Sequence, residues 1–301
     1  MIVSASYRTD IPAFHSRWFL GRLAAGSCQV ANPFGGPDYT VRLDREAVDG
    51  FVFWTRNPAP FAEALTIVRE QAYPFILQQT ITGYPRAIDA ATPSAVQGMA
   101  ALRQVAYRYG TRAAVWRYDP IVITDLTPPA WHRETFTTLA KGLAGTVDEV
   151  VVSFLQVYRK TRRNLDRAAR DGGFTWRDPA DAEKSVLLRS LAGIAAEHGL
   201  RLTLCGQAPL LSDGIGEARC IDAGRLSDVA GRAVAAVAKP HRSGCACARS
   251  TDIGAYDTCP HGCAYCYAVA DRERAKARVA AQDPAADSLA PRRGSGKPAP
   301  G

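Results

Sequence analysis

The sequence predicts an α/β protein built around a parallel β-sheet. Two observations lead to this prediction: short apolar, β-branched or aromatic runs recur along the chain, and longer segments of helical periodicity lie between them. Each run and the segment after it form one βα unit, and a series of such units specifies parallel strands with right-handed crossovers. The pattern allows either a barrel or an open, doubly wound sheet.

The predicted strands are short, nearly continuous apolar runs, as expected for parallel strands that are buried on both faces. They cover residues 2–6, 51–55, 75–82, 113–118, 150–156 and 202–205. The predicted helices cover residues 17–25, 60–71, 93–109, 129–143, 182–198 and 223–238. Pro60, Pro93 and Pro129 lie near helix starts, where a missing N–H costs nothing, and Gly110 and Gly199 follow the last turns of two helices.

Length and composition are those of one large globular domain. Of the 301 residues, 47% are hydrophobic and 22% are charged, which is enough for a sizeable core. We expect one barrel domain over residues 1–281, with a cysteine-rich segment at 245–267. Residues 283–301 contain four prolines, three glycines and no aromatic residue, so we expect disorder from residue 282 onward.

Neither a membrane span nor a signal peptide is visible, so we expect a cytoplasmic protein without membrane contact. The net charge of +8 comes almost entirely from arginine. This excess invites an anionic partner such as a nucleic acid, but without a clustered basic stripe a compositional bias towards arginine is the more common explanation. The chain has no phosphate-binding loop, no nucleophile elbow and no zincin motif, which argues against the corresponding hydrolases.

Polar side chains gather where the predicted strands end, which in a barrel is the functional face. Arg8, Arg56 and Arg117 follow three different strands and are placed to clamp a phosphate or carboxylate of the substrate. Tyr158 and Cys205 are candidate catalytic donors of a proton or hydrogen atom, and the residues do not decide between them.

Five of the eight cysteines lie between Cys245 and Cys266, and without an export signal they favour metal or catalytic chemistry over disulfides. Cys259, Cys263 and Cys266 form a C-x3-C-x2-C loop that precedes a helical run at 269–281. Three thiolates can hold three irons of a cubane and leave the fourth iron open. A structural zinc ion would need a fourth ligand, from His261, Cys245 or Cys247.

The string CPHGCAYCYA resembles the radical S-adenosylmethionine signature, in the version of the spore-photoproduct-lyase-like proteins. The resemblance implies that Cys259, Cys263 and Cys266 hold a 4Fe–4S cluster whose open iron chelates S-adenosylmethionine. Reductive cleavage then gives a 5′-deoxyadenosyl radical that abstracts hydrogen from a substrate, with electrons from a donor such as flavodoxin or ferredoxin. Gly262 would allow the tight turn, and Tyr265 would pack near the adenine.

The whole chain also resembles the family called domain of unknown function 1848, which has no assigned reaction. The resemblance rests on SASYRTDIPAF, VFWTRNPAP and CACARSTDIGAYDTCPHGCAYCYA, and it covers residues 1 to about 267.

The cluster loop of radical S-adenosylmethionine enzymes follows the first barrel strand, whereas here it comes last. A circular permutation reconciles the two orders: residues 252–256 would form the strand before the loop, and residues 2–6 would be its neighbour. Ser6 and Asp10 would then bind the amino end of S-adenosylmethionine. The expected fold is a permuted, incomplete TIM-like (β/α) barrel of the radical S-adenosylmethionine type.

Four other cysteines can form a second centre. Closure of the barrel would bring Cys205 and Cys220 to Cys245 and Cys247, where they would bind a second iron–sulfur cluster or zinc. Alternatively, Cys205 and Cys220 are buried apolar thiols, as we expect for Cys28.

The leading hypothesis is an iron–sulfur radical enzyme with an unknown, anionic or nucleic-acid substrate. The alternative is a non-enzymatic zinc- or iron–sulfur-binding module that contacts nucleic acid through an arginine-rich face.

Overall fold

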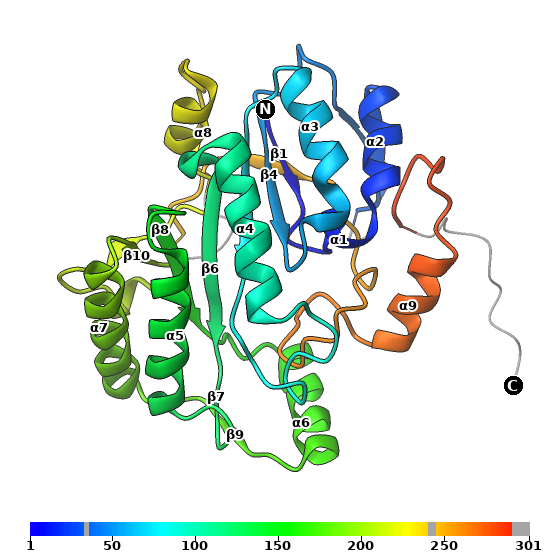
Figure 1. Ribbon diagram of the computed structural model, residues 1–301. Coiled ribbons are helices and arrows are strands. Elements are labelled where there is room, and N and C mark those ends of the chain that lie inside the picture. Colours follow the sequence, from blue (N-terminus) through cyan, green and yellow to red (C-terminus); the bar gives the residue numbers. More distant parts are fainter. Residues whose placement is uncertain (33–35, 240–244, 291–301) are drawn as a thin grey trace, which may run out of the picture.

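A computed structural model describes residues 1–32, 36–239 and 245–290, and its centre is one eight-stranded sheet (Figure 1). The strand order is β11-β10-β8-β6-β5-β4-β1-β12, and each neighbouring pair is parallel. The strands are β1 (Ile2–Ala5), β4 (Gly50–Thr55), β5 (Phe75–Thr80), β6 (Ala114–Ile121), β8 (Glu149–Phe154), β10 (Arg201–Leu204), β11 (Gly216–Glu217) and β12 (Ser250–Asp252). Within the described ranges no ladder joins β11 to β12, so this sheet is open.

Helices cover one face of the sheet, and Figure 1 shows α3, α4 and α5 in front of the strands. They are α2 (Ser16–Ala24), α3 (Ala62–Glu70), α4 (Ala95–Tyr109), α5 (Pro129–Leu143) and α7 (Asp181–Glu197). Phe53, Trp116 and Val152 on the strands belong to the same buried cluster as Leu65, Leu102, Phe136 and Leu188 on these helices. The α/β pattern predicts such an apolar interface between helices and sheet, and its burial is the main source of the stability of the fold.

The opposite face of the sheet has two different halves along the strand direction. A small apolar cluster contains Ile2, Val52, Ile76, Val115 and Val151 from five neighbouring strands. Side chains alternate along a strand, so the residues two positions further on share this face. They are polar or aromatic: Ser4, Trp54, Gln78, Arg117 and Ser153. The carboxyl-terminal half of this face is therefore polar or aromatic, whereas its amino-terminal half is apolar.

The first and last strands of the chain are neighbours. Strand β1 pairs with β12 in parallel, with Ile2 opposite Ser250 and Ser4 opposite Asp252. This adjacency confirms the expectation that residues 2–6 lie beside the strand before the cysteine loop. The last strand is Ser250–Asp252 and not 252–256, because the Asp252 side chain accepts a hydrogen bond from Gly254 N at 2.9 Å and starts a turn there.

All six predicted strands belong to the sheet, and five of the six predicted helices agree within about one turn. The helix predicted at 223–238 is shorter, because α8 (Ala223–Ala230) stops at Gly231, which has a φ of 63°. Helix α6 (Arg159–Gly172) escaped prediction because its sequence is highly charged. Helix α9 (Arg272–Ala280) occupies most of the predicted run 269–281.

The remaining elements lie outside the central sheet. They are α1 (Ile11–Phe14), the hairpin of β2 (Ser27–Val30) and β3 (Tyr39–Arg42), the pair of β7 (Ile123–Thr124) and β9 (Trp176–Arg177), and the short 3-10 helices η1 (Ala59–Phe61), η2 (Thr111–Ala113) and η3 (Ala208–Leu210).

The segment after α9 packs against the domain as far as residue 290. Trp18 Nε1 donates to the carbonyl of Ala286 at 3.0 Å, Gln29 N donates to the carbonyl of Asp287 at 2.8 Å, and Leu289 is buried. Residues 282–290, which composition predicts to be disordered, are instead part of the fold, because α2 and β2 offer them apolar surface and hydrogen-bond donors. Residues 291–301 lie outside the described residues. No helix in the described ranges is long and apolar enough to span a membrane.

Candidate cofactor site in a cysteine-lined cavity

A cavity of about 730 Å³ lies at the carboxyl ends of the strands. Seven of the eight cysteines line it: Cys205, Cys220, Cys245, Cys247, Cys259, Cys263 and Cys266. The exception is Cys28 on β2, which is buried in the helix-side core, where desolvation raises the pKa of its thiol to about 12. Cys28 is thus an apolar-packing thiol, and the other seven share one chamber.

The C-x3-C-x2-C loop is held by the segment that follows β5. Ala264 N donates to the carbonyl of Ile88 at 2.8 Å, and Ala91 N donates to the carbonyl of His261 at 2.9 Å. Asn164 on α6 fixes the other end, since its side-chain amide donates to the carbonyl of Cys266 at 3.0 Å. The loop is therefore anchored at both ends, and its three cysteines line the cavity.

Gly262 is required at the turn between the first two of these cysteines. Its φ is 76°, in the left-handed region that favours glycine. A Cβ atom there would lie 2.7 Å from the Arg272 side chain and 3.1 Å from Ala90 Cβ. The predicted need for glycine at this position agrees with the backbone.

Asp10 connects three elements beside the loop. One carboxylate oxygen accepts a hydrogen bond from Ala13 N at 2.9 Å and caps α1, while the other accepts from Arg56 N at 2.7 Å and lies 2.9 Å from His261 Nε2. Both oxygens thus have protein partners, and the binding of an amino group by Asp10 stays a prediction. The His261 ring faces Asp10 and the carbonyl of Ala91.

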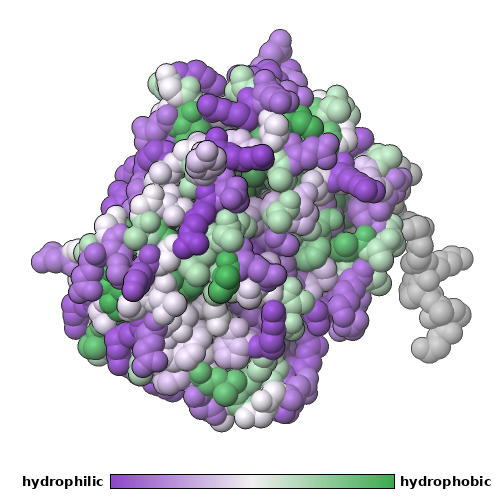
Figure 2. Space-filling view, in the orientation of Figure 1, coloured by the Kyte–Doolittle hydropathy of each residue, from purple (hydrophilic) through white to green (hydrophobic). Residues whose placement is uncertain are grey.

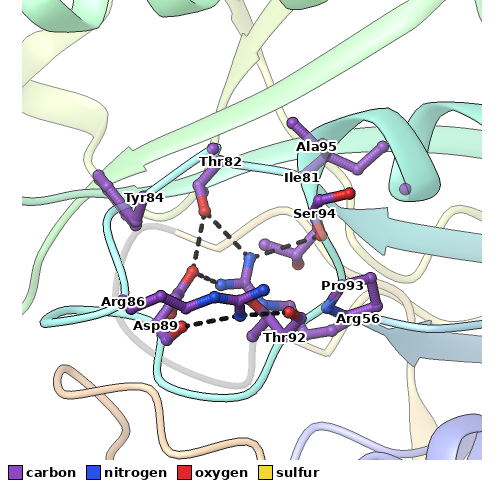
Figure 3. A pocket seen from close by; sticks show the side chains of 13 residues that line it. Arg56, Ile81, Thr82, Tyr84, Arg86, Asp89, Thr92, Pro93, Ser94 and Ala95 are labelled. Atoms are coloured by element: carbon purple, nitrogen blue, oxygen red, sulfur yellow. Dashed lines mark hydrogen bonds and ion pairs between the residues drawn. The ribbon is translucent and has the colours of Figure 1, made fainter.

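Arg56 links the cysteine loop to a buried carboxylate. Its guanidinium pairs with Asp89, donates to Tyr265 Oη at 2.7 Å and donates to Thr82 Oγ1 at 3.2 Å. Figure 3 shows Arg56 and Asp89 together at the wall of a second, smaller pocket of about 190 Å³. Burial lowers the pKa of Arg56, but Tyr265 and Cys263 raise it more, so the net pKa lies above the ordinary value. A permanent cation therefore stands beside Cys263.

The three loop thiols are protonated at neutral pH without a cation. Burial raises the pKa of Cys263 to about 11, with Arg56 acting in the opposite direction and the charges of Cys266 and Cys259 adding to the rise. Burial also raises the pKa of Cys259 and of Cys266. The charge of Cys266 adds to the rise in pKa at both Cys259 and Cys263, so thiolate charges on the loop would repel one another. A soft cation would relieve this repulsion and displace the protons.

The described ranges contain no group of three or more His, Cys, Asp or Glu side chains already arranged to hold a metal ion. The loop therefore offers the right ligands on a shared cavity wall, and its thiol side chains would have to turn inward to meet at one centre.

Each of the three predicted clamp arginines has a carboxylate partner in the chain. Arg8 Nε lies 2.7 Å from Asp252, and Arg117 pairs with Asp119, as Arg56 does with Asp89. All three guanidinium groups line the cavity with their charge compensated. Their action as an anion clamp stays a prediction. A bound anion would have to use the guanidinium N–H groups that are not bonded to these carboxylates.

Asp252 is a site residue that the sequence analysis missed. It accepts hydrogen bonds from Ser4 Oγ at 2.7 Å, Ser6 Oγ at 2.9 Å and Tyr7 N at 3.0 Å, in addition to its pair with Arg8. Ser6 is therefore buried and already engaged. The available signal was a single acidic residue in the strand that precedes the cysteine loop.

The two candidate catalytic residues lie in different surroundings. Tyr158 is 46% exposed, and its ring packs edge-on against Tyr267 with the centroids 6.2 Å apart. Cys205 is buried, and its Sγ lies 3.1 Å from that of Cys220. Tyr265, the predicted adenine neighbour, lines the cavity but packs edge-on against Tyr84 and holds its hydroxyl at Arg56.

Comparisons with known proteins give a matching family model and a distantly similar solved structure. The family model described as domain of unknown function (DUF1848) matches residues 2–268. No curated protein matches the sequence. A solved structure described as the crystal structure of D-hydantoinase aligns with a TM-score of 0.31 and 12% identity, over 68% of this chain and 42% of that chain. This chain thus spans less than half the length of that one, and so distant a likeness says nothing about activity.

Proposed function

We propose, from the premise that the chain belongs to the family described as domain of unknown function (DUF1848), that it is a radical S-adenosylmethionine enzyme. Its fold would be a permuted, incomplete TIM-like barrel of that class. One observation carries the proposal: the loop of Cys259, Cys263 and Cys266 follows β12, lines the cavity at the carboxyl ends of the strands, and lies next to the first strand of the chain.

The residues fit a site-differentiated 4Fe–4S cluster. Three thiols, and no more, come from the loop, which leaves one iron for an exchangeable ligand. The cavity volume of about 730 Å³ lies in the range of small-molecule sites, roughly 300–1,000 Å³, so it has room for S-adenosylmethionine beside the cluster. When bound, the two cofactors supply one-electron reduction and hydrogen-atom abstraction.

The chain itself would position and shield these cofactors. The Arg56 cation beside Cys263 favours the thiolate form, and the pairing of Arg56 with Asp89 holds the guanidinium in place. Asp10 fixes the loop through His261. The buried strand-end groups would orient the substrate away from water, and an electron donor such as flavodoxin or ferredoxin would dock outside the cavity.

Anaerobic reconstitution with iron and sulfide tests the proposal. We expect brown protein that bleaches with dithionite and releases 5′-deoxyadenosine from S-adenosylmethionine. The variant Cys28→Ala is the matched control, because Cys28 lies outside the cavity. Colourless protein that holds zinc at the loop cysteines would overturn the proposal and favour a metal-binding module.

The module alternative would need an arginine-rich face for nucleic acid. The arginines at the cavity are paired with carboxylates, and the face seen in Figure 2 mixes hydrophilic and hydrophobic residues across its elements. The compensated cavity arginines do not supply such a face, and the cysteine loop that lines the cavity favours the enzyme.

A further inference from the structure

Four cysteines outside the C-x3-C-x2-C loop form a continuous set of sulfur contacts. Cys205 Sγ lies 3.1 Å from Cys220 Sγ. Cys220 also contacts the thiol of Cys247, and Cys247 contacts that of Cys245. None of the eight cysteines, all of which are described, is in a disulfide. Four reduced thiols from three separate segments thus lie next to one another in sequence of contact, from Cys205 to Cys245.

These thiols lie where the two edges of the open sheet come together. Cys205 follows β10 and Cys220 follows β11, at one edge of the sheet, whereas Cys245 and Cys247 precede β12, at the other edge. Backbone contacts bridge the two sides: Ala248 N donates to the carbonyl of Ile221 at 3.0 Å, and Ile221 N donates to Cys247 Sγ at 3.4 Å. No β-ladder in the described ranges does so.

The surroundings suit an anionic metal–thiolate group. Arg117 Nη1 donates to Cys220 Sγ at 3.2 Å, which places a guanidinium against the sulfur set. Soft thiolate ligands select zinc, copper(I) or iron–sulfur clusters over hard cations. Without a metal, the contacts of these polarisable thiols with one another are weak S–H hydrogen bonds.

The sulfur spacing distinguishes between a single ion and a cluster. A tetrahedral zinc ion with Zn–S distances of about 2.3 Å brings its sulfurs to about 3.8 Å from one another. The Cys205–Cys220 distance of 3.1 Å is already at or below this spacing. A cubane binds each cysteine to a different iron, so its cysteine sulfurs lie much further apart. The contact chain therefore fits one ion better than a cluster.

We infer that Cys205, Cys220, Cys245 and Cys247 bind one structural Zn²⁺ ion, which clips the two edges of the open sheet together. The four thiols are not yet arranged around a common point, so binding requires rotation of their side chains and loss of their protons. The site uses different cysteines from the loop of the proposed function, although both line the same cavity, and it does not depend on that function.

Metal analysis of the full chain tests this site separately from the loop. The triple variant Cys259→Ser/Cys263→Ser/Cys266→Ser, purified with zinc and without added iron, should keep one zinc ion per chain. Cys220→Ser and Cys247→Ser should lose at least nine-tenths of it, and Cys28→Ser should keep it. Iron and sulfide bound by the triple variant, or no metal in it, would overturn the zinc assignment. If the triple variant retains zinc but forms no 5′-deoxyadenosine, the zinc site is supported, and the lost activity reports only on the loop of the proposed function.

Two measurements on the wild-type chain cover the case in which a variant does not fold. Co²⁺ substitution should give the intense thiolate charge-transfer bands of a tetrahedral sulfur site. Zinc should also protect the same four cysteines from alkylation, as read by peptide mass spectrometry. Unprotected alkylation of these cysteines in zinc-loaded protein, or a Cys205–Cys220 disulfide in its place, would refute the site.

Discussion

Asp10 and His261 join the first helix of the chain to the middle of the cysteine loop, with a carboxylate oxygen 2.9 Å from Nε2. Both side chains are buried. The same carboxylate caps α1 and receives the backbone N–H of Arg56. A residue near the amino terminus thus fixes the conformation of a loop some 250 positions away.

Asp10→Ala tests this link. The loss of a helix cap costs about 1 kcal/mol, and the loss of the hydrogen bond to His261 adds to it. Removal of a charge-assisted bond to the amino group of S-adenosylmethionine would weaken cofactor binding by about one to two decades. Calorimetric melting and a titration of S-adenosylmethionine, both on reconstituted protein, separate the effects. A lowered melting temperature with unchanged affinity would leave Asp10 a purely positioning residue.

Cys259→Ala, Cys263→Ala and Cys266→Ala should each abolish the reducible cluster, because two thiolates cannot hold the three irons that leave a single iron open. Cys28→Ala should retain iron and sulfide at the wild-type level. Elemental analysis and visible spectra after anaerobic reconstitution provide the comparison. A full cluster with turnover in any one of the three variants would rule out the radical assignment.

Gly262→Ala should destabilise the loop by about 1–3 kcal/mol, because alanine is strained at positive φ and its methyl group would meet Arg272. Gly193→Ala on α7 is the control: its φ is not positive and nothing lies within 4 Å of the added Cβ. That change should raise stability by up to about 1 kcal/mol. Urea unfolding measures both. Equal stability of the two variants would contradict the strained turn.

Asp252→Ala should cost about 3–5 kcal/mol, because it leaves the guanidinium of Arg8 buried without its counter-charge. Asp44→Ala removes a partly exposed carboxylate that is paired with an exposed arginine, Arg42, and should have a far smaller effect. Denaturation midpoints of the two variants decide the matter. A small effect at Asp252 would mean that Arg8 reaches solvent when its partner is lost.

His132 should make the metal-free protein less stable in acid. Burial lowers the pKa of His132 to about 4 from an ordinary value of 6.5. The unfolded chain therefore binds the extra proton first, and stability is full above pH 6.5 and falls as the pH drops from 6.5 towards 4. The loss reaches on the order of 3 kcal/mol.

The His132→Gln variant should lack this part of the pH dependence, although it also loses the contact with Tyr118 Oη at 2.7 Å. Urea unfolding at several pH values between 4 and 8 gives the slope for both proteins. Parallel slopes would show that other groups cause the acid sensitivity.

The sequence alone determined the succession of strands and helices along the chain and the position of the C-x3-C-x2-C loop. Both are local properties: the period of apolar residues reports which face of an element is buried, and a three-cysteine motif needs only a short loop. The adjacency of β1 and β12 also followed from sequence, through the resemblance of the loop. Helix α6 was not predicted because residues 159–172 are mostly charged and contain only Leu165 as a large apolar residue.

Only the tertiary structure decided how the polar strand ends are paired. Arg8 meets Asp252 across 244 positions, and Arg56 meets Asp89 and Tyr265. The local sequence pattern does not assign these partners. Buried charges need a partner, and the assembled strands determine which groups lie within reach. The same holds for residues 282–290, whose composition predicts disorder but which find a buried surface on α2 and β2. Composition describes what a segment can bury by itself, whereas the fold determines what other segments offer it.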